Sequence, residues 1–188
     1  MFYVVKYTGP FGFIKPWTAV RDGETFSQQF LTPSIIEGIE KKIFSELLNQ
    51  KGISRIVRHK LSYSAINSQQ EQTQTRGWEF KRTEKRMIRP LSILNRGIMI
   101  NPVLHLAFKN KENALKAYEE HICLCRNEDV VLPIEFMELS ESEFDKIDGF
   151  ELRFGESDQS FMVGFNRFNE NKPMYGWIEI SGKPVLSK

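Results

Sequence analysis

The middle of the chain, residues 55–96, constrains the fold more than any other stretch. It holds ten lysines and arginines against three glutamates, a local charge of about +7, whereas the net charge of the whole chain is +2. The stretches on either side, residues 53–61 and 98–108, read as strands. An insertion of this size between two strands is uncommon in a compact domain and is usually functional or disordered.

The basic segment also carries aromatic and polar side chains. Trp78, Phe80 and His59 lie among the cations, and a glutamine- and threonine-rich tract, residues 69–75, precedes most of them. This mixture suits a polyanion with stackable bases, so RNA or single-stranded DNA is the expected ligand. The alternative is a long solvated hairpin whose arginines only keep the protein soluble.

Candidate RNA-binding residues come from two places in the chain. Lys15 lies in a glycine- and aromatic-rich loop at residues 9–17, and Arg21 follows this loop; here the backbone can approach a ligand closely and cations can reach phosphate. We expect the aromatic residues of that loop to plug the core. The candidates in the basic segment are Arg58, His59, Lys60, Arg76, Trp78, Lys81, Arg82, Lys85, Arg86 and Arg89.

The order of strand and helix patterns predicts an α+β fold. Thr32 and Pro33 form a helix start, and Pro102 interrupts the second flanking strand. The expected order is β-α-β, basic excursion, β-α-β, which is that of a ferredoxin-like (RRM-like) βαββαβ domain with two helices on one face of an antiparallel sheet. The pattern predicts strands at 2–7, 53–61, 98–108 and 122–124, and helices at about 33–48 and 109–121.

These patterns divide the chain into two parts. Residues 1–129 form the predicted ferredoxin-like RNA-binding domain, with a basic thumb-like insertion at about 62–96. Residues 130–188 read as a small β-rich C-terminal extension packed on that domain. Between residues 112 and 158 there are fourteen acidic residues against four basic ones, so we expect this side to face away from nucleic acid.

Cofactor and metal chemistry is not indicated. Phosphate-loop, serine-hydrolase and zinc-protease motifs are absent from the sequence. Cys123 and Cys125 are too few for a zinc site and are expected to be structural thiols, with Arg126 as a structural partner of Glu128 and Asp129. We therefore expect no cofactor and no metal. Neither an export leader nor an apolar run of 18 residues is present, which predicts a cytoplasmic protein without membrane contact.

One catalytic alternative remains open. His59 and Lys60 with Tyr63 offer the groups for metal-free RNA cleavage, in which a base activates a 2′-hydroxyl and a cation stabilises the phosphorane. Adjacent residues of one strand rarely converge on a substrate. The expected role is therefore non-catalytic, with no catalytic residues assigned.

The order of these features resembles a known family. A first strand runs into the loop at residues 9–15, a helix starts with Pro33, Ser34 and Gly38, a basic insertion follows, and Leu124, Arg126, Glu128 and Asp129 come behind it. Together they resemble the CRISPR-associated Cas-five family over about the whole chain. Cys125 stands where that family has a glycine.

The resemblance implies a non-catalytic subunit that binds CRISPR RNA and caps the 5′ handle of the guide within a type I (Cascade) interference complex for antiviral defence. Its implied partners are CRISPR RNA and the backbone-forming and large subunits, with target DNA contacted indirectly. The alternative that it implies is a metal-independent endoribonuclease that processes precursor CRISPR RNA. In the cleaving branch of the family, Lys and His stand in the other order, whereas here His59 precedes Lys60.

Overall fold

The body of the protein is one large antiparallel sheet. The computed structural model describes residues 1–16, 23–75, 77–166 and 169–186. Eight strands pair in the order β10-β11-β1-β9-β4-β12-β14-β13. Their bounds are β1 (Phe2–Thr8), β4 (Ile56–Ser62), β9 (Val103–Phe108), β10 (Ile122–Cys123), β11 (Val130–Leu139), β12 (Gly149–Phe154), β13 (Phe161–Asn166) and β14 (Lys172–Ser181).

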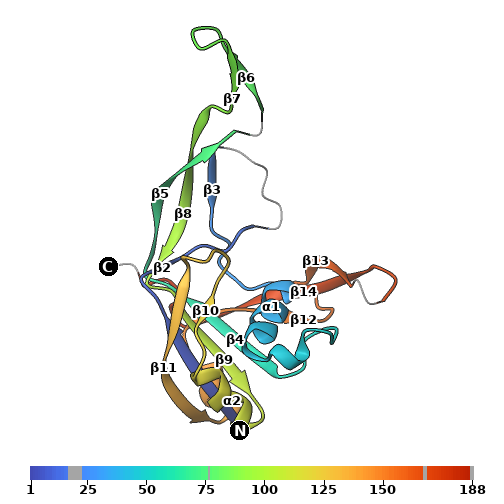
Figure 1. Ribbon diagram of the computed structural model, residues 1–188. Helices are drawn as coiled ribbons and strands as arrows, with labels where there is room; N and C mark the ends of the chain where they lie inside the picture. The colour runs from blue at the N-terminus through green and yellow to red at the C-terminus, as the bar shows by residue number, and fades with distance from the viewer. Residues whose placement is uncertain (17–22, 76, 167–168, 187–188) are drawn as a thin grey trace.

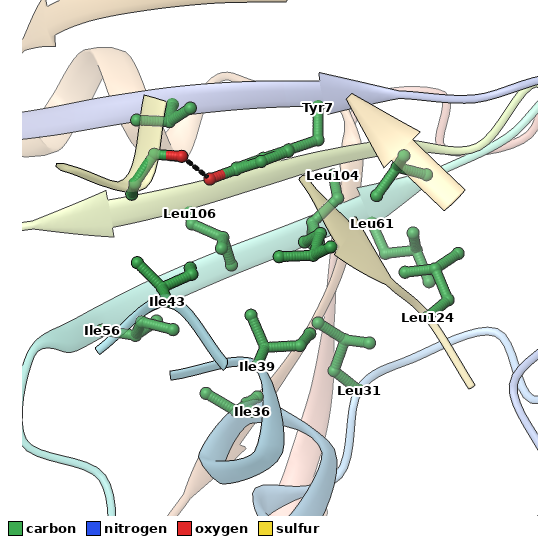
Figure 2. Packing of buried hydrophobic residues seen from close by; sticks show 14 of the residues in the cluster. Tyr7, Leu31, Ile36, Ile39, Ile43, Ile56, Leu61, Leu104, Leu106 and Leu124 are labelled. Atoms are coloured by element: carbon green, nitrogen blue, oxygen red, sulfur yellow. Dashed lines mark hydrogen bonds between the residues drawn. The ribbon is translucent and has the colours of Figure 1, made fainter. Parts of the chain in front are cut away.

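Two helices, α1 (Pro33–Ile43) and α2 (Lys111–Tyr118), cover one face of this sheet. Ile36, Ile39 and Ile43 recur at helical spacing on α1 and are buried. They pack against alternate residues of the strands, such as Leu104 and Leu106 of β9 (Figure 2). Tyr7 of β1 fixes α2, because its hydroxyl donates a hydrogen bond to the carbonyl oxygen of Ala117.

The sequence predicted the start of α1 correctly but not its end. The helix begins at Pro33 after Thr32, as the proline indicated, but the predicted hydroxyl cap does not form: the Thr32 hydroxyl makes no hydrogen bond to the helix backbone and lies 3.1 Å from the Ser34 hydroxyl. It stops at Ile43, and residues Ser45–Leu47 form a short 3-10 turn rather than a continuation of the α-helix. Phe44 and Leu47 are nevertheless buried, as the apolar periodicity predicted, whereas Leu48 at the end of the predicted helix is 63% exposed.

The predicted α+β ferredoxin-like fold is confirmed. Along the chain, β1, α1, β4, β9, α2 and β11 give four strands in the spatial order β11-β1-β9-β4, with both helices on one face. The fourth strand differs from the one predicted. Residues Ile122 and Cys123 form only a two-residue strand on the outer edge of β11, whereas β11 pairs with β1 from Phe2↔Leu139 to Thr8↔Leu132.

This pairing corrects the division at residue 130. Strand β11, which we assigned to the C-terminal extension, completes the ferredoxin-like sheet because it is the neighbour that β1 needs on its open side. The remaining strands β12, β14 and β13 extend the same sheet beyond β4. The C-terminal part is therefore an edge extension of the body.

A short helix, α3 (Glu141–Asp145), covers part of the opposite sheet face, which we call the second face. Its N-terminus is fixed by a capping box in which Ser140 and Glu143 exchange hydrogen bonds with each other's backbone. Phe144 of this helix is fully buried against Phe2, Val4 and Ala107. The second face therefore has a small core of its own.

The basic insertion is a long β-hairpin that projects from the body (Figure 1). Strands β5 (Ala65–Gln74) and β8 (Leu91–Ile100) form its stem, and β6 (Glu79–Lys81) and β7 (Arg86–Ile88) form its tip. The stem continues the register of β4 and β9, from Arg58↔Ala107 and Ser62↔Val103 to Ala65↔Ile100 and Gln74↔Leu91. Two short strands, β2 (Phe11–Gly12) and β3 (Glu24–Phe26), pair with the other side of β8.

The stem and the body belong to different sheets. The strand predicted over 98–108 is interrupted at Asn101 and Pro102, where Asn101 adopts φ 48° and the chain passes from the hairpin sheet into the body sheet. Proline cannot donate a ladder hydrogen bond, so it suits this break. The interruption predicted at Pro102 is therefore a turn between two strands, β8 and β9.

Candidate nucleic-acid interface

The tip of the hairpin gathers exposed cations and aromatic rings. Between residues 77 and 89 the chain carries five basic residues and two glutamates. Trp78 is 57% exposed and Phe80 is 58% exposed. The guanidinium of Arg89 lies 4.7 Å from the centre of the Trp78 ring. Lys81, Arg82, Lys85, Arg86 and Arg89 are all exposed.

The charge of the tip is only partly compensated. Glu84 pairs with both Lys81 and Arg86 across the turn between β6 and β7. These two hydrogen bonds lower the pKa of the Glu84 carboxyl. Within the part of the chain that the structure describes, Arg82, Lys85 and Arg89 have no acidic partner. Three cations at the tip are therefore available to an anionic ligand.

Arg58 and Lys60, which we expected to contact RNA, are buried in the body. Arg58 donates to Glu151 (Nε to Oε1, 2.6 Å) and to Asp145 (Nη2 to Oδ1, 2.9 Å). The ammonium of Lys60 donates to the carbonyl oxygens of Asp145 and Ile147 and to the hydroxyl of Ser181, each at 2.8 Å. Both cations hold α3 and the C-terminal strands against the second face, so they are not available to contact RNA.

His59 is buried as well, and its chemistry does not fit an exposed contact. Only 4% of His59 is exposed, and its Nε2 atom has no hydrogen-bond partner in the described chain. Burial lowers the pKa of His59 to about 4, and burial lowers the pKa of His105 on β9 to about 4 as well. Both imidazoles are therefore neutral at pH 7. Consecutive residues of a strand point to opposite faces, so Lys60, which reaches α3, points away from His59.

The other predicted residues fall outside this group. Lys15 is exposed in the loop after β2. Arg21 and Arg76 lie outside the described residues. Phe13 of the same loop is buried, as the plug interpretation predicted.

The hairpin meets the body around Phe13. The sequence did not indicate that Arg96 and Arg126 contact this ring. The guanidinium of Arg96 on β8 lies 5.2 Å from the Phe13 ring centre, and that of Arg126 lies 5.3 Å from it. Arg126 also donates to the fully buried Asp129 (2.7 and 2.8 Å) and to Gln69 of the stem (3.2 Å). The predicted structural pairing of Arg126 with Glu128 and Asp129 is confirmed.

The helix-start residues of the resemblance lie elsewhere. Pro33, Ser34 and Gly38 line a hollow of about 750 Å³ between the start of α1 and strands β13 and β14.

Among the described residues, no group of three or more His, Cys, Asp or Glu side chains is arranged to hold a metal ion. None of the described helices is both long and apolar enough to cross a membrane.

The fold and the tip together define an antiparallel α+β body that carries an exposed basic hairpin. No protein-family model matches the chain, and no curated protein matches it. A chain of a solved structure described as a CRISPR RNA-guided surveillance complex has the same fold, with a TM-score of 0.56 and 10% sequence identity. The match covers 98% of this chain and 91% of that one, so body and hairpin are both included.

Proposed function

We propose that this protein is a non-catalytic RNA-binding subunit of a type I (Cascade) CRISPR RNA-guided surveillance complex, in which it caps the 5′ handle of the guide RNA. Backbone-forming and large subunits would be its neighbours, and it would meet target DNA only indirectly. One observation carries the proposal: the chain shares its fold along almost its whole length with a chain of a structure described as a CRISPR RNA-guided surveillance complex, and it presents uncompensated cations at the tip of a projecting hairpin.

The chemistry of the tip suits a single RNA strand. Arg82, Lys85 and Arg89 can pair with phosphates, and the exposed rings of Trp78 and Phe80 can stack on bases. The acidic residues of the body repel phosphate, which favours contact at the hairpin. A soluble hairpin without a ligand would not need two aromatic rings more than half exposed beside its cations.

The state of the histidines supports a binding role over an endoribonuclease. A general base has to come within roughly 2.6–3.2 Å of the proton that it abstracts. His59 is buried between strand and helix layers, and Lys60 is engaged by three oxygens on the other face of the sheet. Neither group is free to serve a substrate bound at the tip.

Charge reversal at the tip tests the proposal. In Arg82→Glu with Lys85→Glu, binding to the copurifying guide RNA should weaken, and the slope of log affinity against log salt should fall by about 1.4, since each lost contact with a single strand removes about 0.7. Lys109→Glu with Lys146→Glu changes the charge equally at exposed sites of the body and should leave the slope unchanged. Equal slopes for the two double variants would overturn the proposal.

Incubation with precursor RNA tests the non-catalytic part. The purified chain should leave a repeat-containing CRISPR RNA intact in EDTA over hours, as judged on a denaturing gel. Cleavage at one specific site in EDTA would instead assign the endoribonuclease function.

A further inference from the structure

One edge of the hairpin stem is unpaired. Strand β5 pairs with β8 along all ten residues, whereas β8 has further neighbours, β2 and β3, on its other side. No other described strand pairs with β5. A ten-residue strand therefore ends the hairpin sheet with a free edge.

The hydrogen bonds show which backbone groups face this edge. The N–H of Thr75 donates to the carbonyl of Pro90, which places the odd-numbered residues of β5 toward β8. On β8, odd-numbered Asn95 and Gly97 bond to the β3 segment, in agreement with this alternation. The N–H and C=O groups of the even-numbered residues, Ile66, Ser68, Gln70, Gln72 and Gln74, consequently point away from the hairpin.

The free edge lacks the usual protection against strand pairing. Native edges are blunted by lysines, prolines, bulges or short length. Residues 65–74 contain no lysine and no proline, and their pairing with β8 has no register shift. The one charge, Glu71, is ion-paired with Arg96. Among the outward N–H groups, that of Ser68 donates a hydrogen bond to the side-chain oxygen of Asn67 (2.8 Å).

An uncharged apolar face adjoins the same edge. Leu91 and Ile93 of β8 are 63% and 58% exposed, and they lie opposite Gln74 and Gln72 on one face of the stem. The ring of Phe26, which is 58% exposed, lies over Gly97 on that face, since a Cβ atom on Gly97 would meet it. Apart from Phe26, the exposed apolar side chains of this face are aliphatic and do not stack with bases as aromatic rings do, and a neutral stem does not attract a polyanion.

We propose that β5 receives an extended segment of a second protein subunit, which adds a strand to the hairpin sheet and covers the apolar face. The inference rests on the proposed function, because that function places the chain in a complex that contains other protein subunits. A polypeptide is the occupant because its alternating N–H and C=O groups match those of the edge, and because the stem is neutral while the tip beyond it is basic. One hairpin would thus bind RNA at its tip and protein along its stem.

A proline at an outward position of β5 tests the free edge without removing a hydrogen bond between β5 and β8. Gln72→Pro removes an N–H that points to the edge and leaves the N–H groups that bond to β8 intact. Gln72→Ala removes the same side chain but keeps the N–H, so it is the matched control. Gln70→Pro repeats the change one outward position away, in case one proline disturbs the fold.

The experiment uses the tagged full-length chain purified with its native protein and RNA partners, with native mass spectrometry as the readout. Gln72→Pro and Gln70→Pro should recover about ten-fold less protein partner than wild type, while Gln72→Ala recovers a normal amount. Guide-RNA affinity of the purified chain should not change in any of them. Hydrogen exchange should show Glu71 and Thr73 still protected by β8 in a folded proline variant, and the outward amides should gain protection only in the complex.

Four outcomes are informative. Normal partner recovery with a folded Gln72→Pro variant would overturn the inference. Recovery of RNA without any protein partner would overturn it too and leave RNA binding standing. A proline-sensitive protein partner without RNA would support the inference and overturn the proposed function. A proline-sensitive homodimer of the purified chain in sedimentation would show that a second copy occupies the edge, against the proposal.

Discussion

The base and the tip of one β-ribbon use the same residue types in opposite ways. At the base, Arg58 and Lys60 are buried and bonded to carboxylates, carbonyls and a hydroxyl. At the tip, Arg82 and Lys85 are exposed and have no acidic partner among the described residues. The strands keep one register from Arg58 to Gln74, so local conformation does not separate the two pairs.

What separates them is the surroundings that other parts of the chain supply. Residues 141–151 bring Glu151, Asp145 and the carbonyls of the α3 segment over β4, and these groups replace the water that a buried cation loses. Nothing in the described chain covers β6 and β7 in this way. A cation therefore becomes structural or available for a ligand according to what folds over it.

The largest stability effect should come from the base. Arg58→Met leaves the carboxylate of Glu151, 2% exposed, without its hydrogen-bonded partner and with only the more distant Arg153 at 3.6 Å, and should lower the free energy of unfolding in urea by about 3–5 kcal/mol. Arg82→Met at the tip should change it by less than about 0.5 kcal/mol. A double change, Arg58→Met with Glu151→Leu, should recover much of the loss; equal stability of the two single variants would erase the contrast.

Acidification should lower the stability of the body through its buried histidines, His59 and His105. In the fold, burial holds the pKa of His59 and of His105 at about 4, below the value of about 6.5 in the unfolded chain. The unfolded state thus binds more protons, and stability is complete above pH 6.5 and falls as the pH drops toward 4, by roughly 3 kcal/mol for each histidine.

Urea unfolding at pH 7, 6 and 5 measures this dependence. His105→Leu should flatten it by about half, because one of the two buried titrating groups is gone. A wild-type stability that is constant over this range would show that the histidines are solvated in the folded protein.

An intermediate effect is expected at the joint around Phe13. Asp129→Asn weakens the charge-assisted hydrogen bonds to Arg126, whose side chain reaches both Phe13 and Gln69 of the stem. The cost should be about 1–3 kcal/mol. Hydrogen exchange should accelerate at residues 65–70 more than in the α1 core; a uniform acceleration would mean that Arg126 does not hold the stem.

The smallest stability effect belongs to the tip. Trp78→Ala should change the free energy of unfolding by less than about 0.5 kcal/mol, because the ring is 57% exposed and contacts mainly Arg89. Its effect on RNA affinity should be larger, about 5- to 150-fold, if the ring stacks on a base. Trp78→Phe, which keeps an aromatic face, should retain most of the affinity in the same fluorescence titration.

The sequence by itself determined the local features of this protein. The apolar spacing of Ile36, Ile39 and Ile43 and the Thr32-Pro33 pair predicted α1, and the α+β order of elements predicted the ferredoxin-like body. The charge of residues 55–96 predicted a basic insertion, and Arg82 and Lys85 are indeed exposed on it. Periodicity, capping and charge density act between residues close in the chain, which is why the sequence carries them.

Tertiary structure alone decided which of those cations are available. Arg58 lies 93 residues from Glu151, and Arg126 lies 57 residues from Gln69, so no local pattern marks these pairs. The choice of β11 over residues 122–124 as the fourth strand likewise depended on which segment could pair with the whole length of β1. Burial and strand pairing depend on partners that are far away in sequence. These partners come together only when the sheet forms and packs against its core.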